Sequence, residues 1–121
     1  WLRKRNEVII LSDTFREFIE PLLHKLQQPT VFCHFLQIDD NLRIVNYCLR
    51  QKDQKRHAVK ALKSLNYSVT AIGDSYNDIS MLTEADHGIF FRPTKTIADE
   101  YPEFPVTDKF ETLKKELEQL K

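Results

Sequence analysis

Two aspartates near the middle of the chain, Asp74 and Asp78, have the type and spacing needed to do chemistry. Asp74 follows a short apolar run, 69–72, and a glycine, Gly73, so it is predicted to lie just past the carboxyl end of a buried strand. Ligands of parallel α/β sheets bind at that edge. Asp78 falls in the first turn of the next predicted helix, close to Asp74. Two carboxylates placed in this way suit Mg²⁺, which prefers oxygen ligands and keeps some of its waters.

Other roles for this segment are open. In many proteins an aspartate only caps a helix or begins a turn, and Asp78 and Asp74 could do no more than that. The run Gly73-Asp74-Ser75 also resembles the start of a GDS-type esterase, with Ser75 as the nucleophile. That esterase family takes its triad histidine from an Asp-x-x-His block, and no histidine of this chain has an aspartate three residues before it. We therefore rank the esterase below the metal site.

The composition limits the class of protein. Eighteen basic residues balance eighteen acidic ones, so we expect neither nucleic acid nor a membrane as a partner. Cys33 and Cys48 form no C-x-x-C pair, which argues against a disulfide scaffold or a zinc site and favours a reducing, cytoplasmic location. The longest apolar run near the start, 8–11, is too short for a signal-peptide core or a membrane span.

Predicted strands and helices alternate along the chain, a pattern typical of an α/β fold with a parallel sheet. Apolar runs predict strands at 8–11, 30–34, 69–72 and 88–91, and an alternating pattern predicts a β-hairpin over 35–49. Apolar positions at three- and four-residue spacing predict helices over 15–26 and 55–65, after Asp78, from 94 and from 108. The length and composition fit a single domain over 1–121.

Local signals sharpen three of these predictions. Pro21 should make the first helix kink or restart, because proline removes a backbone donor and clashes one turn back. Asp108 and Glu111 have the spacing of a capping box at the start of the last helix. One face of the first helix is predicted to be buried, and it consists of Phe15, Phe18, Ile19, Leu22, Leu23 and Leu26.

Further polar groups are predicted to gather at the strand ends near the two aspartates. Ser12 follows the first strand, and a basic cluster of Lys52, Lys55 and Arg56 lies where the second long helix begins. An ammonium group at a helix start can bind a phosphate together with the backbone donors there. Most lysines are simply solvated, so the convergence of these groups, more than any one of them, indicates a phosphate site.

In combination these residues resemble a known family. Ile9-Ile10-Leu11-Ser12, a lysine at a helix start and the run 73–78 follow the order of motifs two, three and four of the haloacid dehalogenase superfamily. The runs VIILSDTF, LRQKDQKR and AIGDSYND, together with the IDD hairpin turn, are similar to its phosphoserine phosphatase and homoserine phosphotransferase branch. The resemblance spans essentially the whole chain and implies a Rossmann-like core with a β-hairpin insertion.

The resemblance also implies a Mg²⁺-dependent phosphomonoester hydrolase or phosphotransferase that works through an aspartyl-phosphate. Ser12 would donate its hydroxyl, and the backbone around Asp13 its amide, to the phosphoryl oxygens. Lys55 would neutralise those oxygens and the nucleophile, and would act with Ser12 in catalysis. We prefer Lys55 to Lys52 because it lies three residues before the apolar face of its helix.

The remaining residues that match the family's motifs would supply contacts to a metal and to the substrate. Asp74 would bind Mg²⁺, and Asp78 would either support that metal site or orient the lysine. Asn77 would contact the substrate, which the resemblance implies is a small phosphorylated metabolite similar to phosphoserine. Proteins of this family select among such metabolites with a helical cap, and no segment of this sequence matches that cap.

The family's first motif, which supplies the aspartate nucleophile and a second acid, is also not found. Asp39-Asp40 is the only pair of aspartates after an apolar residue, but its acids are adjacent and lie in a hairpin turn, so we reject it. We therefore expect the carboxyl-terminal portion of a phosphatase, without the central strand and cap and inactive alone. Two unpaired sheet edges would favour a homo-oligomer. A non-catalytic phosphate-binding regulatory module is the alternative.

Overall fold

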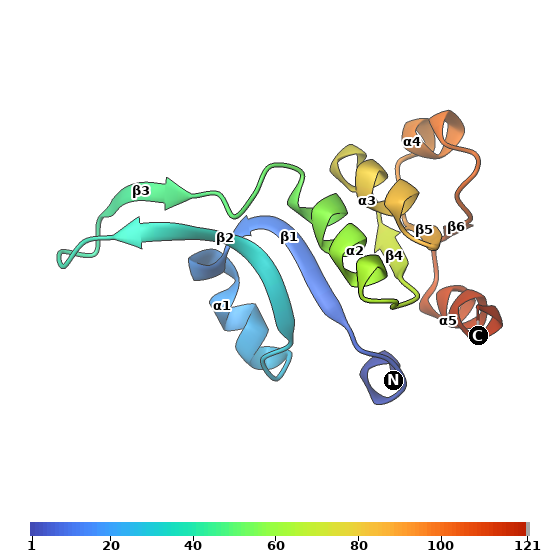
Figure 1. The fold of residues 1–121 in the computed structure, drawn as a ribbon, viewed down its shortest axis with the longest axis horizontal. Coiled ribbons are helices and arrows are strands. Elements are labelled where there is room, and N and C mark those ends of the chain that lie inside the picture. Colours follow the sequence, from blue (N-terminus) through green and yellow to red (C-terminus); the bar gives the residue numbers. More distant parts are fainter. Residues whose placement is uncertain (121) are drawn as a thin grey trace. The chain divides into compact units, whose positions relative to one another are not determined.

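The computed structural model describes residues 1–120 and divides the chain into two compact units. The amino-terminal unit is Trp1–Gln54 and the carboxyl-terminal unit is Lys55–Lys121. Figure 1 shows that each unit combines strands with helices, as predicted for an α/β protein. The prediction of one domain over 1–121 stays a prediction. Within residues 1–120, no helix has the length and apolar character needed to cross a membrane.

The amino-terminal unit is a three-stranded sheet with one helix beside it. Its strands have the order β1-β2-β3, in which β1 and β2 are parallel and β2 and β3 form the predicted antiparallel hairpin. Helix α1 contacts β1 and β2, and buries Leu23. The elements are the 3₁₀ turn η1 (Leu2–Lys4), β1 (Ile9–Phe15), α1 (Arg16–Lys25), β2 (Thr30–Ile38) and β3 (Ile44–Cys48).

The end of β1 is irregular, and this irregularity places Ser12. Ile9 to Leu11 pair in register with Thr30 to Phe32, and the register then shifts before Phe15 meets His34. Ser12 and Asp13 therefore lie past the regular ladder, although both still belong to β1. This is where the apolar run 8–11 predicts that the strand's regular pairing should end.

The carboxyl-terminal unit is a parallel sheet with the strand order β4-β5-β6. The apolar runs that predict β4 and β5 are confirmed, whereas the two-residue β6 is too short to be predicted from its pattern. The unit's core includes Val59, Leu82, Ile89, Phe90 and Ile97. Its elements are α2 (Gln54–Ser64, from the last residue of the first unit), β4 (Thr70–Gly73), η2 (Tyr76–Asp78), α3 (Ile79–Glu84), β5 (His87–Phe91), α4 (Lys95–Glu100), β6 (Val106–Thr107) and α5 (Phe110–Gln119).

Strands β1 and β4 each lie at an edge of their own sheet. Within residues 1–120, β1 pairs only with β2, and β4 pairs only with β5. Backbone donors and acceptors along the outer sides of β1 and β4 therefore have no strand partner in their own sheets. Exposed edges of this kind are sites at which another strand can pair.

Helix α1 corrects two of the sequence predictions. It runs from Arg16 to Lys25 with Pro21 inside it, so the predicted restart at Pro21 is wrong. Proline here removes only the hydrogen bond to the carbonyl of Glu17, in the first turn, where water can satisfy that carbonyl. The predicted buried face is also too wide, because Phe18 and Leu22 are 63% and 53% exposed while Leu23 is 1% exposed. Only a narrow stripe of the helix meets the sheet.

The start of α5 corrects a third prediction. Its N-cap is Lys109, whose side chain makes no capping hydrogen bond, so the capping box of Asp108 and Glu111 is wrong. The carbonyl oxygen of Asp108 instead accepts a hydrogen bond from Arg92 Nε at 2.7 Å. This contact with the residue after β5 holds Asp108 outside the helix.

Candidate functional site

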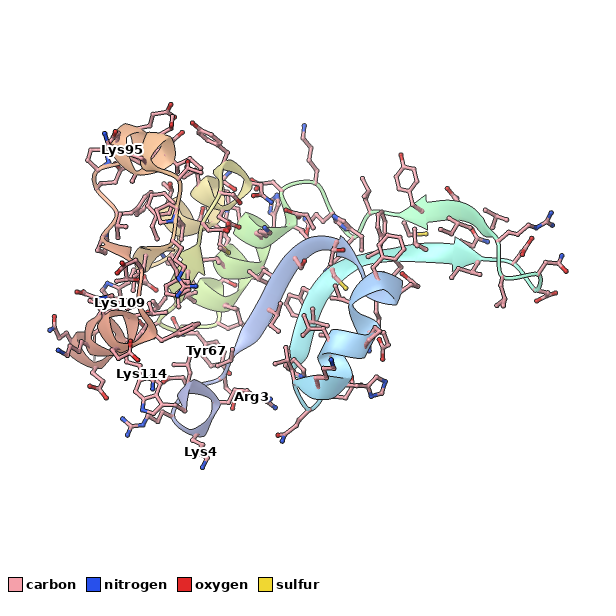
Figure 2. The ribbon with its side chains drawn as sticks, turned by 180° about the vertical axis from the view of Figure 1, so that it is seen from behind. Arg3, Lys4, Tyr67, Lys95, Lys109 and Lys114 are labelled. Atoms are coloured by element: carbon pink, nitrogen blue, oxygen red, sulfur yellow. The ribbon has the colours of Figure 1, made fainter. Side chains whose placement is uncertain are left out.

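Lys55 and Asp78 form a buried ion pair in the carboxyl-terminal unit. Lys55 Nζ lies 2.8 Å from Asp78 Oδ1, and the two side chains are only 9% and 8% exposed. In contrast to Lys55, the lysines Lys95 and Lys109, which are labelled in Figure 2, are exposed to solvent. Burying a charge is costly unless it is paired and hydrogen-bonded, so the ammonium group of Lys55 is held in place by Asp78.

The second oxygen of Asp78 holds the loop that carries Asp74. Asp78 Oδ2 accepts hydrogen bonds from the backbone N–H of Asp74 at 3.0 Å and of Ser75 at 3.3 Å, and from Ser75 Oγ at 3.2 Å. Burial by itself would raise the pKa of the Asp78 carboxyl. The hydrogen bonds from Lys55 and from the two amides outweigh that effect and lower this pKa below its usual value. Asp78 therefore stays ionised and links the lysine to the loop.

These contacts bear on the two roles predicted for Asp78. Both of its oxygens are already engaged, by an ammonium group on one side and by amides on the other. The arrangement favours the role of orienting Lys55 over direct binding of a metal, and direct binding stays a prediction.

Gly73 makes this arrangement sterically possible. A Cβ atom added at Gly73 would lie 2.5 Å from Asp78 Cβ and 2.7 Å from Asp78 Cγ. Within residues 1–120 no glycine has a positive φ, so Gly73 provides space for the Asp78 side chain and not a left-handed turn. The close approach that Gly73 allows is therefore made by the side chain of Asp78.

We expect Gly73→Ala to displace Asp78 and to lower the free energy of unfolding by about 1–3 kcal/mol, the usual cost of overpacking. Urea unfolding of the purified chain measures this loss. Gly88→Ala is the matched control, since a Cβ there would also clash, at 2.7 Å from the carbonyl oxygen of Leu82, but away from the Asp74 loop. Only Gly73→Ala should also weaken the binding of Mg²⁺, and equal metal binding by both variants would contradict the role given to Gly73.

Asp74 is the carboxylate of this loop that is available to a ligand. Its side chain is exposed and makes no hydrogen bond or ion pair with any of residues 1–120. Over the same residues, no group of three or more His, Cys, Asp or Glu side chains is placed to hold a metal. A site with one free carboxylate does not fit structural zinc, but it fits Mg²⁺, which is usually held by one or two carboxylates with waters and substrate phosphates.

The other side chains of the loop bond to one another and to α4. Ser75 Oγ contacts Asn77 Oδ1 and Asp78 Oδ2, and among the described residues it has no histidine partner, as an esterase nucleophile would need. Tyr76 Oη donates a hydrogen bond to Glu100 Oε2 at 2.8 Å, which ties the loop to α4 and raises the pKa of Tyr76. Sequence reasoning missed this contact, because nothing in the sequence pairs a loop tyrosine with a glutamate 24 positions later.

Ser12 and Asp13 lie in the amino-terminal unit. Ser12 Oγ accepts a hydrogen bond from the backbone N–H of Thr14 at 3.3 Å, which leaves the hydroxyl proton available for a ligand oxygen. Two residues that the sequence did not single out, Gln54 and His34, approach Asp13. The structure thus brings Lys55 together with the Asp74 loop in one unit. That Ser12 lies close to Lys55 and the Asp74 loop stays a prediction.

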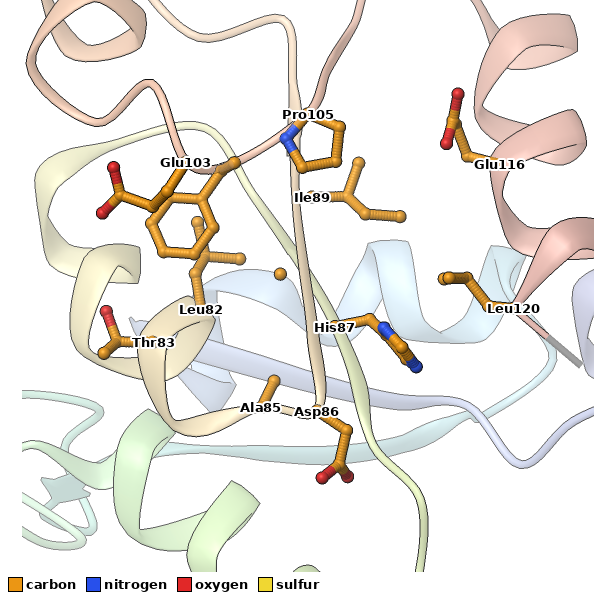
Figure 3. A pocket seen from close by; sticks show the side chains of 12 residues that line it. Leu82, Thr83, Ala85, Asp86, His87, Ile89, Glu103, Pro105, Glu116 and Leu120 are labelled. Carbon is orange, nitrogen blue, oxygen red and sulfur yellow. The ribbon is translucent and has the colours of Figure 1, made fainter.

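A cavity of about 320 Å³ in the carboxyl-terminal unit lies away from these groups (Figure 3). It is lined by the start of β5, including His87 and Ile89, and by Glu103 and Glu116. Asp74 follows the carboxyl end of β4, which runs parallel to β5, whereas the cavity lies at the amino end of β5. The cavity and the Asp74 loop therefore lie at opposite ends of the strands. The cavity is not part of the candidate site.

The family of the chain follows from a comparison of its sequence with protein-family models. The model described as haloacid dehalogenase-like hydrolase matches residues 1–83, which include Ser12, Lys55 and Asp74. The chain belongs to the haloacid dehalogenase-like hydrolases. The resemblance noted from its motifs is thereby confirmed.

Curated relatives of the chain carry the names of phosphatases. It is 54% identical over 116 residues to phosphoserine phosphatase ThrH of Pseudomonas aeruginosa, an alignment that covers 96% of the chain and 57% of the relative. It is 53% identical over 116 residues to a phosphoserine phosphatase of Pseudomonas syringae pv. tomato, covering 96% of the chain and 49% of the relative. The chain therefore spans about half the length of these relatives.

Solved structures support the fold of the chain. A substrate-bound phosphoserine phosphatase complex superposes with a TM-score of 0.71 at 22% identity, covering 98% of the chain and 58% of that structure. A phosphoserine phosphatase in apo form gives a TM-score of 0.68 at 22% identity, covering 88% of the chain and 56% of that structure. These matches confirm the α/β fold with parallel sheets that the sequence predicts.

Proposed function

We propose that the protein containing this chain is a Mg²⁺-dependent phosphomonoester hydrolase or phosphotransferase of the phosphoserine phosphatase type. The observation that carries the proposal is the buried Lys55–Asp78 pair beside the free carboxylate of Asp74. This arrangement offers a fixed positive charge and a metal-binding oxygen within one loop and helix start. The two relatives named phosphoserine phosphatase, each more than half identical to the chain over 116 residues, favour a small phosphorylated metabolite as the substrate.

The chain's own residues would bind and orient the phosphoryl group. Ser12 donates its hydroxyl proton to a phosphoryl oxygen, since its oxygen already accepts from Thr14. The ammonium group of Lys55 neutralises charge on the same group, as oriented donors do when charge shifts in the transition state. Asn77 is exposed on the Asp74 loop and contacts the substrate. This role requires the two units to bring Ser12 and Lys55 to one phosphate.

Asp74 would hold the Mg²⁺ ion, with waters and phosphate oxygens as the other ligands. The bound ion supplies Lewis-acid stabilisation of negative charge on the phosphoryl oxygens. Asp78 keeps the Asp74 backbone in place through its Oδ2 atom, and so fixes the start of the loop that presents the Asp74 carboxylate.

The attacking group is the part of this mechanism that we assign to another segment. Covalent phosphoryl transfer through an aspartyl-phosphate needs a positioned carboxylate nucleophile. The sequence lacks the family motif that supplies it, and the chain spans about half of its curated relatives. We infer that the nucleophile of the complete protein comes from outside these 121 residues.

Phosphate release from phosphoserine in the presence of Mg²⁺ tests both parts of the proposal. We expect the full-length protein to release phosphate and the 121-residue chain to show no turnover above the uncatalysed rate. The chain carrying Asp74→Asn is the matched control for contaminating phosphatases. Turnover by the chain alone that Asp74→Asn abolishes would mean that it contains its own nucleophile. No release by the full-length protein from any small phosphomonoester would overturn the proposed function.

A further inference from the structure

The side chain of Gln54 is buried and bonds to the two residues proposed to bind phosphate in the amino-terminal unit. Gln54 is only 5% exposed and is the first residue of α2. Its Nε2 atom donates to the carbonyl oxygen of Ser12 at 2.6 Å and to Asp13 Oδ1 at 3.2 Å. Both partners only accept hydrogen bonds, so the amide must face them with its nitrogen.

The other end of the same amide is unsatisfied. Gln54 Oε1 is buried and has no hydrogen-bond partner among residues 1–120. A buried acceptor without a donor opposes folding, and such groups are rare in native proteins. An apolar side chain of the same shape would avoid this cost. The presence of glutamine here therefore calls for a benefit other than stability.

Asp13 receives a second contact from a buried histidine. His34 Nδ1 accepts the backbone N–H of Arg50 at 3.0 Å, so the proton of the neutral ring lies on Nε2. That Nε2 atom lies 3.9 Å from Asp13 Oδ1, the oxygen that Gln54 also contacts. Donor groups of two buried residues thus approach one oxygen of the carboxylate that follows Ser12.

We propose that Gln54 is a positioning residue that fixes the segment Ser12–Asp13 for phosphate binding. Its two hydrogen bonds hold the Ser12 carbonyl and the Asp13 carboxylate past the regular part of β1, where the strand ladder no longer does so. The Ser12 hydroxyl and the Asp13 backbone amide then keep one orientation toward the phosphoryl oxygens. This inference rests on the proposed function and adds to it a residue that does not itself touch the substrate.

The test compares Gln54→Met with the wild type in the full-length protein. Methionine keeps the length of the side chain and removes both the donor and the unsatisfied acceptor. We expect an unchanged or higher melting temperature, with the KM for phosphoserine and the inhibition constant of inorganic phosphate both raised about ten- to hundredfold, as misplaced binding groups cause. The change should be smaller in kcat than in KM. Gln119→Met, on the exposed side of α5, is the matched control and should change neither quantity.

A second variant separates positioning from a merely structural role. Gln54→Leu also fills the site without polar atoms and should reproduce the weaker phosphate binding at wild-type stability. Unchanged constants for phosphoserine and phosphate in both variants would overturn the inference, and so would loss of folding in both. The proposed function is judged separately, from turnover by the wild type, so failure of this inference leaves that result untouched.

Discussion

Replacing Lys55 by methionine is expected to lower the free energy of unfolding by about 3–5 kcal/mol, which is a large fraction of the stability of a small protein. The variant leaves Asp78 as a buried charge without its ammonium partner, although both backbone amides still contact it. Urea unfolding of the 121-residue chain measures the loss. In the full-length protein the same variant should also lose turnover, since the positive charge proposed to face the phosphate is gone.

Lys52→Met is the matched control, because Lys52 is exposed and lies only three residues earlier. It should change the free energy of unfolding by no more than about 0.5 kcal/mol.

The pH dependence of unfolding gives a second test of the Lys55–Asp78 pair. The pKa of Asp78 is lowered from 3.8, so the pair stabilises the folded state fully above that pH and loses its contribution as the pH falls below it. The difference between the wild type and Lys55→Met should therefore shrink below pH 3.8, and a constant difference would contradict this account.

Asp74→Asn is expected to reduce turnover of phosphoserine by the full-length protein roughly 10³-fold, the scale seen when one group that stabilises transition-state charge is removed. Calorimetric titration should show weaker Mg²⁺ binding. The free energy of unfolding should stay near that of the wild type, since the Asp74 carboxylate is exposed and has no partner among residues 1–120, and its backbone N–H still reaches Asp78.

Asp40→Asn provides the comparison for Asp74, because Asp40 is an exposed aspartate in the hairpin turn of the other unit. It should leave both turnover and Mg²⁺ affinity unchanged. Wild-type metal affinity in Asp74→Asn would remove Asp74 from the metal site, even if turnover fell. The assignment of Mg²⁺ to this loop would then fail, while the Lys55–Asp78 pair would stand on its own geometry.

The parts of the fold that the sequence predicted are those set by local pattern. Short apolar runs predicted β4 and β5, and alternation predicted the hairpin of β2 and β3, because burial on one or both faces leaves a direct trace in the sequence. The Gly73 loop was predicted for a similar reason, since a small residue followed by polar ones must end a buried strand. Lys55 was preferred to Lys52 by its place on the helix, and it is the buried one.

The parts that failed depend on contacts between distant segments. The capping box at Asp108 fails because Arg92 binds the Asp108 carbonyl, and no local signal reports that bond. The buried face of α1 was drawn too wide because spacing shows which side chains share a face and does not show how much of that face the sheet covers. Gln54 and His34 were missed because the role of a glutamine or a histidine depends on the residues that it contacts, here Asp13, and the sequence does not show those contacts.

The packing of Gly73 against Asp78 and the ion pair between Asp78 and Lys55 make these three positions depend on one another. Any larger residue at position 73 needs a shorter one at 78, and a shorter one there no longer reaches the ammonium group. A single substitution at one of these positions therefore causes either a steric clash or a buried charge without its partner. The effects of substitutions at the three positions should therefore be coupled and not additive, as is usual for residues in direct contact.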